Sequence, residues 1–192
     1  MCSGFKRSNA TEENARKLLN MGADMILLTG NPSTGVTNET ITEAIKRVQS
    51  AVGPQMMIAA GKMHAAGVES EAGENIINEA TIKDFIEAGA DIVLLPAPGA
   101  VPGITLESAV EMVRFVHQEG ALSITAIATS QEGSDEDTIR RIALMCKMTG
   151  TDIHHIGDAG VGGLDPQNIM AYSIAIRGKR HTFSRMARSV NR

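Results

Sequence analysis

One short pattern occurs three times in the chain, as Met21-Gly-Ala-Asp-Met-Ile-Leu-Leu28, Ala88-Gly-Ala-Asp-Ile-Val-Leu-Leu95 and Thr149-Gly-Thr-Asp-Ile-His-His-Ile156. In each copy a glycine is followed after one residue by an aspartate and then by an apolar run. Glycine is the usual residue just after the end of a helix, and a short apolar run after it is typical of a buried strand. The repeat therefore predicts the same helix-to-strand junction at three points, 67 and 61 residues apart.

Two further apolar runs lie midway between the copies, so that the strand-helix unit measures about 33 residues. The five strands are expected at residues 24–29, 55–61, 91–96, 121–128 and 152–157. Amphipathic helices are expected at residues 11–20, 39–51, 81–87, 106–118 and 137–148, with another starting at Asp165-Pro166. Strands that alternate with helices at this period predict a parallel sheet in one α/β domain spanning residues 1–192.

Polar or glycine residues follow the carboxyl end of every expected strand, for example Thr29-Gly-Asn-Pro and Gly61-Lys-Met-His. In a (β/α)8 barrel all such ends meet at one mouth, whereas an open doubly wound sheet gathers ligands at one switch point. Five elaborate strand ends favour five units of a barrel, a partial TIM-type (β/α)8 barrel. The doubly wound sheet stays open as the alternative.

Several longer motifs resemble a bacterial barrel family, notably Leu28-Thr-Gly-Asn-Pro-Ser-Thr-Gly35, Ala60-Gly-Lys-Met-His-Ala-Ala-Gly67 and Pro96-Ala-Pro-Gly-Ala-Val-Pro-Gly103. From about residue 10 to 188 the chain is similar to the C-terminal two-thirds of proteins labelled phosphonomutase-like or haloacid-dehalogenase-like hydrolases. The resemblance implies the last five βα units of a barrel. It carries no specific reaction, because the Asp-x-Asp pair of the dehalogenase-type phosphatases is absent after the first strand, and the magnesium ligands of the phosphonomutase group lie on earlier strands.

Composition and charge exclude several classes of protein. Aromatic residues make up only 3% of the chain, which disfavours stacking on nucleic-acid bases, and no apolar run approaches the length of a membrane span. Cys2 and Cys146 do not have the spacing of a metal-binding motif or of a disulfide framework, so a reducing cytoplasm is the expected location. Residues 177–192 hold six Lys or Arg and no acid, which leaves a net charge of −10 on residues 1–176 and suggests an interface.

Lys62 and His64 follow the second expected strand and are two residues apart, so we expect them to reach the mouth together. A lysine there can bind phosphate or carboxylate, or form a Schiff base if desolvation lowers its pKa, and the histidine can move protons. The alternative is a solvated lysine beside a packed histidine.

His154 and His155 are adjacent in the last strand and so must point to opposite faces. If Thr29 and Asn31 face the mouth, alternation places His155 inside and His154 toward the helices. Two adjacent strand residues cannot hold one metal from the same face, so we name no metal-ligating residues. The cofactor stays open: a divalent ion such as Mg²⁺ is compatible with the sequence but not evident from its residues.

Loops after the last two strands of a barrel most often hold phosphate, and both are polar or glycine-rich here. Glu132 is a candidate acid or base, its alternative being a helix-capping surface residue. The candidate binding residues in these loops are Ser130, Gln131, Gly157, Asp158, Gly160, Gly162 and Gly163, and Thr29 and Asn31 after the first strand are candidates for the same role.

The sequence predicts a lyase, isomerase or hydrolase that acts on a small phosphorylated or carboxylated metabolite, with Lys62, His64, His155 and Glu132 as candidate catalytic residues. The alternative is a ligand-binding or truncated barrel remnant without activity. Five strands of a barrel leave two open edges, so we also expect a homo-oligomer or a separate N-terminal fragment to cover them.

Overall fold

The fold is seen in a computed structural model that describes residues 9–128, 131–157 and 165–188. Its five strands form a single parallel sheet in the order β1-β2-β3-β4-β5. The strands are β1 (Met25–Leu28), β2 (Met57–Gly61), β3 (Ile92–Pro96), β4 (Leu122–Ile127) and β5 (Ile153–Ile156). Sequential order excludes the doubly wound sheet, in which an early strand would lie between two later ones.

The helices match the expected ranges to within one or two residues. They are α1 (Glu12–Asn20), α2 (Asn38–Val52), α3 (Glu79–Glu87), α4 (Leu106–Gln118), α5 (Glu136–Thr149) and α6 (Pro166–Ala187). Local caps explain where they start, since Thr37 and Thr105 each accept a backbone N–H three residues later and form capping boxes. None of the helices in the described ranges is long and apolar enough to cross a membrane.

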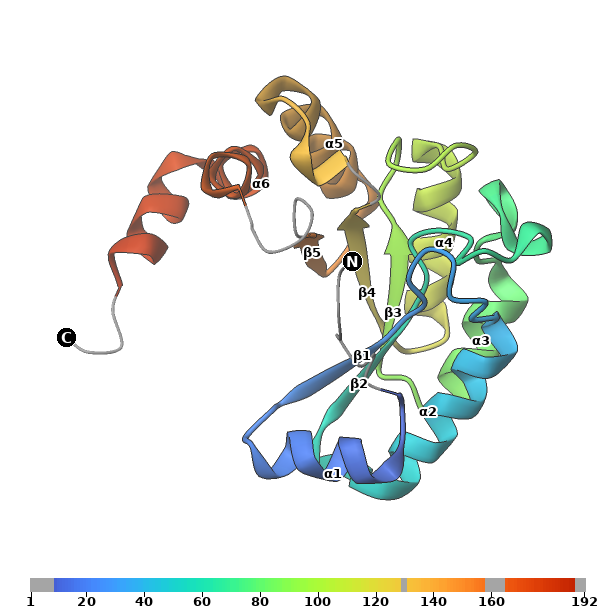
Figure 1. The fold of residues 1–192 in the computed structure, drawn as a ribbon. Helices are drawn as coiled ribbons and strands as arrows, with labels where there is room; N and C mark the ends of the chain where they lie inside the picture. The colour runs from blue at the N-terminus through green and yellow to red at the C-terminus, as the bar shows by residue number, and fades with distance from the viewer. Residues whose placement is uncertain (1–8, 129–130, 158–164, 189–192) are drawn as a thin grey trace, which may run out of the picture.

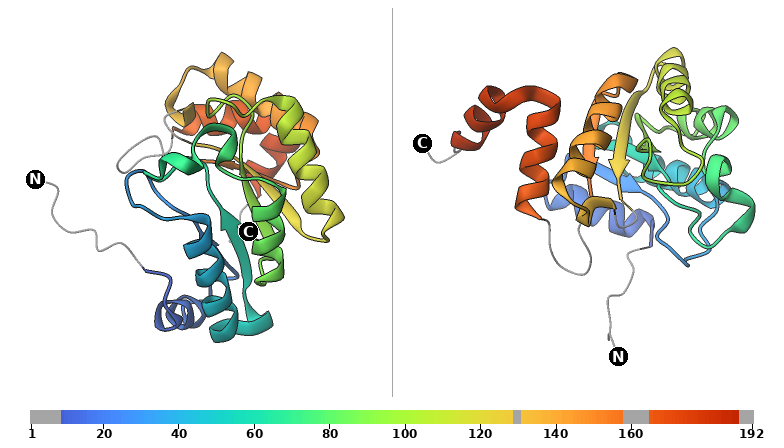
Figure 2. Two further views of the ribbon diagram at one scale, coloured as in Figure 1. Left: turned by 90° about the vertical axis from the view of Figure 1, so that its right-hand side faces the viewer. Right: turned by 90° about the horizontal axis from the view of Figure 1, so that it is seen from above.

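The helices follow one another in an arc around the outside of the curled sheet (Figure 1). The other views show the same half-barrel, with α6 at the end of the arc (Figure 2). The prediction of a partial (β/α)8 barrel is therefore confirmed. The prediction that a glycine follows three of the helices is confirmed too, because Gly22, Gly89 and Gly150 all have the positive φ of a left-handed helix cap.

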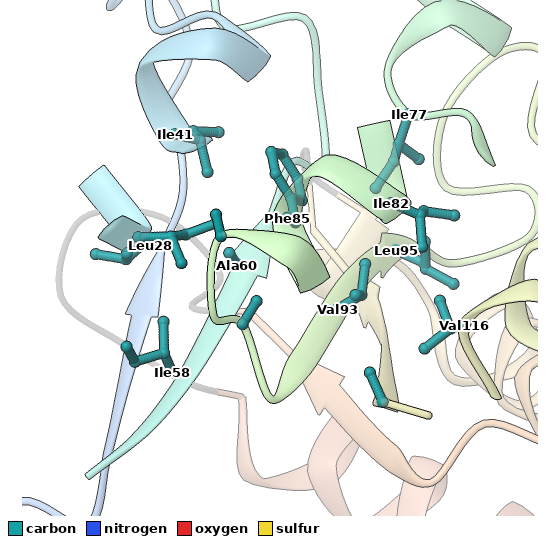
Figure 3. Close-up of a cluster of buried hydrophobic side chains, with 14 of the residues drawn as sticks. Leu28, Ile41, Ile58, Ala60, Ile77, Ile82, Phe85, Val93, Leu95 and Val116 are labelled. Atoms are coloured by element: carbon teal, nitrogen blue, oxygen red, sulfur yellow. The ribbon is translucent and has the colours of Figure 1, made fainter. Parts of the chain in front are cut away.

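A large apolar core lies between the sheet and the helices. Leu28, Ile58 and Val93 on the strands contact side chains of α2, α3 and α4 such as Phe85 (Figure 3). Alternate strand residues supply this outer face, and their neighbours in the sequence point to the concave inner face. The inner cluster consists of Ala59, Ile92, Leu94, Ile124 and Ala126, with Leu27, Met63 and Ile153 at its margin.

The two ends of the sheet differ in the length of the segments that join strands to helices. After β1, β2 and β3 the chain makes loops of eight residues or more before the next helix, whereas the turns that enter the strands are short. At Gly61 the backbones of β2 and β3 come too close for a side chain, because a Cβ atom there would lie 2.0 Å from the carbonyl oxygen of Leu94. The long loops therefore gather at the carboxyl end of the sheet, where barrels hold their sites.

Candidate functional site

The loops after β1, β2 and β3 pack against one another and form a continuous rim at the carboxyl end of the sheet. The Gly35 N–H donates to the Ala66 carbonyl at 2.8 Å, which joins the first loop to the second. The second loop touches the third where Gly103 approaches the Glu74 backbone. These contacts between loops hold the rim together at the carboxyl end of the sheet.

Lys62 lies at the start of the second of these loops and is fully buried. Its ammonium group forms an ion pair with Glu71 of the same loop. The Glu71 carboxylate also accepts the backbone N–H of Asn38, the first residue of α2, at 3.1 and 3.2 Å. Negative charge near the first turn of a helix is stabilising. Through its two interactions Glu71 links Lys62 to the start of α2.

Burial shifts the pKa values of Lys62 and of the neighbouring histidine. It lowers the pKa of Lys62 to about 8, because the charged form loses its water. Burial also lowers the pKa of His64, opposed by a backbone hydrogen bond and aided by the charge of Lys62. The Nδ1 atom of His64 is buried without a hydrogen-bond partner. The site thus places a lysine that loses its proton readily beside a neutral imidazole.

The structure separates Lys62 from His155. Met63 packs at the margin of the inner cluster, so alternation places Lys62 on the outer side, in line with Ile58 and Ala60. On β5 the Tyr172 hydroxyl lies 3.4 Å from Nδ1 of His154, which confirms that His154 faces the helices. His155 faces inward beside Ala126, its register partner. Lys62 and His155, both named above as candidate catalytic residues, therefore lie on opposite faces of the sheet.

Glu132 lies in a short 3-10 helix, η4 (Gln131–Gly133), and is buried rather than exposed. Its backbone carbonyl accepts from the Asn168 side chain at 2.9 Å, which ties the loop to α6. The Oε2 atom is buried with no hydrogen-bond partner. The cap of α5 is Asp135, which accepts from the N–H groups of Asp137 and Thr138, so Glu132 does not cap that helix.

The remaining candidates spread along the carboxyl edge. Thr29 is half-buried, with its Oγ1 atom lacking a hydrogen-bond partner, and Asn31 is exposed. Gln131 is half-buried, and the Gly157 N–H donates to the Ile127 carbonyl at 2.8 Å. Outside the described residues lie the candidates Ser130, Asp158, Gly160, Gly162 and Gly163.

Sequence reasoning missed Glu71, the partner of Lys62. A signal was present in the loop, because Glu69-Ser-Glu71 places two acids close behind a lysine that must be neutralised if it is buried. Which acid turns inward depends on the fold of the loop. Among the described residues no three His, Cys, Asp or Glu side chains gather to hold a metal ion.

A second polar cluster lies at the opposite end of the sheet. Asp152 Oδ2 is 2.8 Å from His117 Nε2 and accepts from the hydroxyl and the N–H of Ser123, both at 2.8 Å. These residue types occur in hydrolases, but here histidine and serine share one carboxylate oxygen, and Ser123 is fully buried. The cluster therefore fixes strand register and offers no accessible nucleophile.

Comparison with known proteins places the chain in a family. A family model described as "Domain of unknown function (DUF7916)" matches residues 4–192, so the chain belongs to that family. Among curated proteins, none matches the chain by sequence.

Two solved structures show the same fold over most of this chain. One is the chloride-inhibited dihydrodipicolinate synthase from Acinetobacter baumannii complexed with pyruvate, with a TM-score of 0.55, 19% identity and coverage of 88% of this chain and 54% of that one. The other is "QR15, an Aldolase", with a TM-score of 0.58, 12% identity and coverage of 87% and 69%. At these identities the likeness shows the barrel fold alone. The phosphonomutase-like and dehalogenase-like labels find no support; only the barrel remains of that resemblance.

Proposed function

We propose that this member of the DUF7916 family is a (β/α)-barrel enzyme of the lyase class that acts on a small carboxylated or phosphorylated metabolite. The buried amine of Lys62 at the carboxyl end of β2 carries the proposal. An ordinary lysine is almost fully protonated at neutral pH, but an amine with a pKa of about 8 is roughly one-tenth neutral at pH 7. The neutral amine is the form that attacks a carbonyl carbon.

The chemistry that fits Lys62 is formation of a Schiff base. The amine nitrogen bonds to the carbonyl carbon of the substrate, and the carbonyl oxygen leaves as water after taking up two protons. His64 is suited to pass one of these protons, because its lowered pKa keeps the ring neutral and able to accept. The iminium product withdraws electrons from the neighbouring carbon–carbon bond, whose cleavage or formation is lyase chemistry.

A carboxylated substrate also accounts for the burial of Lys62. The Glu71 carboxylate occupies the position that a substrate carboxylate needs in order to neutralise the ammonium group. A substrate that takes this position releases Glu71, which keeps its hydrogen bond to Asn38. One barrel neighbour is titled as a complex with pyruvate, a small carboxylate, which supports the proposal of a carboxylated substrate.

The loops after β4 and β5 are our candidates for holding a phosphate or second carboxylate group. Glu132 adds a buried carboxylate beside the first of these loops. His155 faces the concave inner side, away from Lys62, and takes no part in this scheme.

A second function is favoured by one observation. Glu71 neutralises Lys62 and accepts the N–H of Asn38, so Lys62 and Glu71 are also explained as a purely structural link, here called the latch, between the loop after β2 and the start of α2. The chain would then be a barrel that binds a small ligand without transforming it.

Borohydride trapping separates the two functions. The purified chain is incubated with pyruvate, then with a panel of other small 2-oxo acids and aldehydes, reduced, and analysed by peptide mass spectrometry. The lyase proposal predicts one reduced adduct on Lys62, lost in Lys62→Arg and retained in Lys46→Arg, a matched surface control. Adducts spread evenly over surface lysines, with none on Lys62, would favour the latch.

A further inference from the structure

The last part of α6, residues 179–187, is a short helix that stands apart from the body of the protein and is here called the distal segment. Gly178 breaks the helical backbone before it, with φ 78° and ψ 164°, and the distal segment extends away from the sheet (Figure 1, Figure 2). Thr182 is its only buried residue, and the Thr182 hydroxyl lies 3.0 Å from the Ser173 hydroxyl of the first part of α6. Isolated helices shorter than about 12–15 residues are marginal in water, so the distal segment needs a further contact to be stable.

The distal segment presents an apolar centre flanked by positive charge. Phe183 is 47% exposed and Met186 is 61% exposed, and their spacing of three residues places them on one face of the helix. Lys179 and Arg180 lie four and three residues before Phe183, so they flank the same face. Within the described ranges no acid forms an ion pair with either base. This face therefore fits a partner whose surface is apolar and bordered by acids.

A groove with that complementary pattern lies between α3 and α4. It encloses about 210 Å³, and it combines buried apolar side chains with three exposed glutamates. None of these glutamates forms an ion pair with a base in the part of the chain that the structure describes. The apolar residues are Ile77, Ile104 and Met112, and the glutamates are Glu74, Glu79 and Glu111.

Two observations restrict where the distal segment can bind. A larger cavity of about 400 Å³ between α4 and α5 is lined by Arg114 and His117, so it repels a basic helix. The acidic groove of the same chain is out of reach, because α5 lies between α6 and α4 and the contact of Thr182 with Ser173 holds the distal segment in place (Figure 1). The groove must therefore belong to another molecule.

We infer that the distal segment docks in the groove between α3 and α4 of a second copy of this chain. Phe183 and Met186 contact the apolar lining of the groove, and Lys179 and Arg180 face its glutamates. Each copy carries one distal segment and one groove, so two copies can exchange them. The inference depends neither on the edges of the sheet nor on the proposed chemistry at Lys62.

The charge of the whole chain favours a second copy over a membrane. Residues 177–192 hold six Lys or Arg and no acid, whereas residues 1–176 have a net charge of −10. An acidic body attracts the basic segment of another copy but is repelled by an anionic lipid surface. The exposed apolar face also has only two large side chains, which is little for a helix that lies in a bilayer interface.

Sedimentation velocity of the full chain over a range of concentrations tests the inference. We expect a dimer at micromolar concentration in about 0.05 M salt that dissociates in about 0.5 M salt, because salt screens exposed charges. Arg180→Glu should weaken dimerisation about tenfold or more, since it places like charges together. Arg114→Glu is the matched control: it makes the same change at an exposed arginine of α4 outside the groove and should leave dimerisation unchanged. Far-ultraviolet circular dichroism checks that each variant is folded.

An exchange of charges identifies the groove as the partner surface. A chain with both Glu74→Lys and Glu111→Lys should dimerise as poorly as the Arg180→Glu chain. Mixing the two variant chains should restore a dimer that contains one of each. In the mixed pair the acidic segment meets the basic groove, and the basic segment meets the acidic groove.

Three results would overturn the inference. A parent chain that stays monomeric at low salt would show that the distal segment does not bind a second copy. Dimerisation that Arg180→Glu leaves unchanged, or that mixing does not restore, would place the interface elsewhere. Arg180-dependent binding to vesicles of anionic phospholipid, without dimerisation, would show that the segment binds a membrane instead.

Discussion

Replacing Asp91 with alanine removes a carboxylate hydrogen bond that joins the start of β3 to β2, and the structure gives the size of the effect. The variant loses a 2.8 Å hydrogen bond from the Ile58 N–H to a carboxylate, and Ile58 is buried, so its N–H is left without that acceptor. Hydrogen bonds to charged groups contribute about 1.5–3 kcal/mol. Because the Asp91 side chain is largely exposed, we expect a loss near the lower end, about 1.5–2 kcal/mol in the free energy of unfolding.

Asp24→Ala is the matched comparison. The two aspartates occupy the same place in the repeat, but no group among the described residues donates to the Asp24 carboxylate, so its removal should change the free energy of unfolding by less than about 0.5 kcal/mol. Urea unfolding followed by far-ultraviolet circular dichroism measures both variants, since the chain has no Trp and only one Tyr. For a chain of this length the Asp91 variant should also melt about 3–8 °C below the parent.

Two outcomes would refute the reasoning. Equal losses in the two variants would show that the aspartates act through something other than the preceding strand, for example the helix cap before them. An Asp91→Ala variant as stable as the parent would show that the hydrogen bond is replaced by water at no cost. An unchanged slope of the free energy against urea is the control that the unfolding reaction itself is the same.

Two other predictions concern single residues. Gly61→Ala should cost about 3 kcal/mol or more, or abolish folding, because its Cβ would lie 2.0 Å from the Leu94 carbonyl oxygen; thermal melting equal to that of the parent would contradict this. Burial raises the pKa of Asp152, but hydrogen bonds from His117 and Ser123 outweigh it and lower the pKa below 3.8. The folded state then binds fewer protons than the unfolded chain, so this contribution is complete above pH 3.8 and is lost as the pH falls through the folded pKa. Asp152→Asn should therefore lose less stability than the parent between pH 6 and pH 3. Parallel curves of melting temperature against pH would count against a stabilising role of the Asp152 carboxylate.

The arrangement of helices and strands could be predicted from the sequence because it depends on near neighbours in the chain. The cap at Thr37, the glycines that end helices and the apolar runs act over a few residues, and each keeps its meaning wherever the segment lies. The repeat added the sequential order, since similar units joined by right-handed crossovers lie side by side. The sequence also predicted correctly that His154 faces the helices, because strand residues alternate strictly between two faces.

The position of Lys62 depended on the tertiary structure. Spacing placed it at the mouth with His64, but its side depends on how the chain leaves β2, and Met63 takes the inner position. The partner Glu71 in turn meets α2 through Asn38, 33 residues away in the sequence. Contacts of this kind form only when separate loops pack together, and no local pattern encodes them.

The repeated aspartate shows most clearly what each level determines. The sequence by itself established that Asp24, Asp91 and Asp152 are equivalent, because the same residues surround each of them. Only the tertiary structure showed what they do, since the carboxylates of Asp91 and Asp152 hold strands that begin about 30 residues earlier. It also showed that Asp24 differs from them, and the physical reason is that a hydrogen bond needs both partners: the sequence supplies the acceptor, and the neighbouring strand must supply the donor.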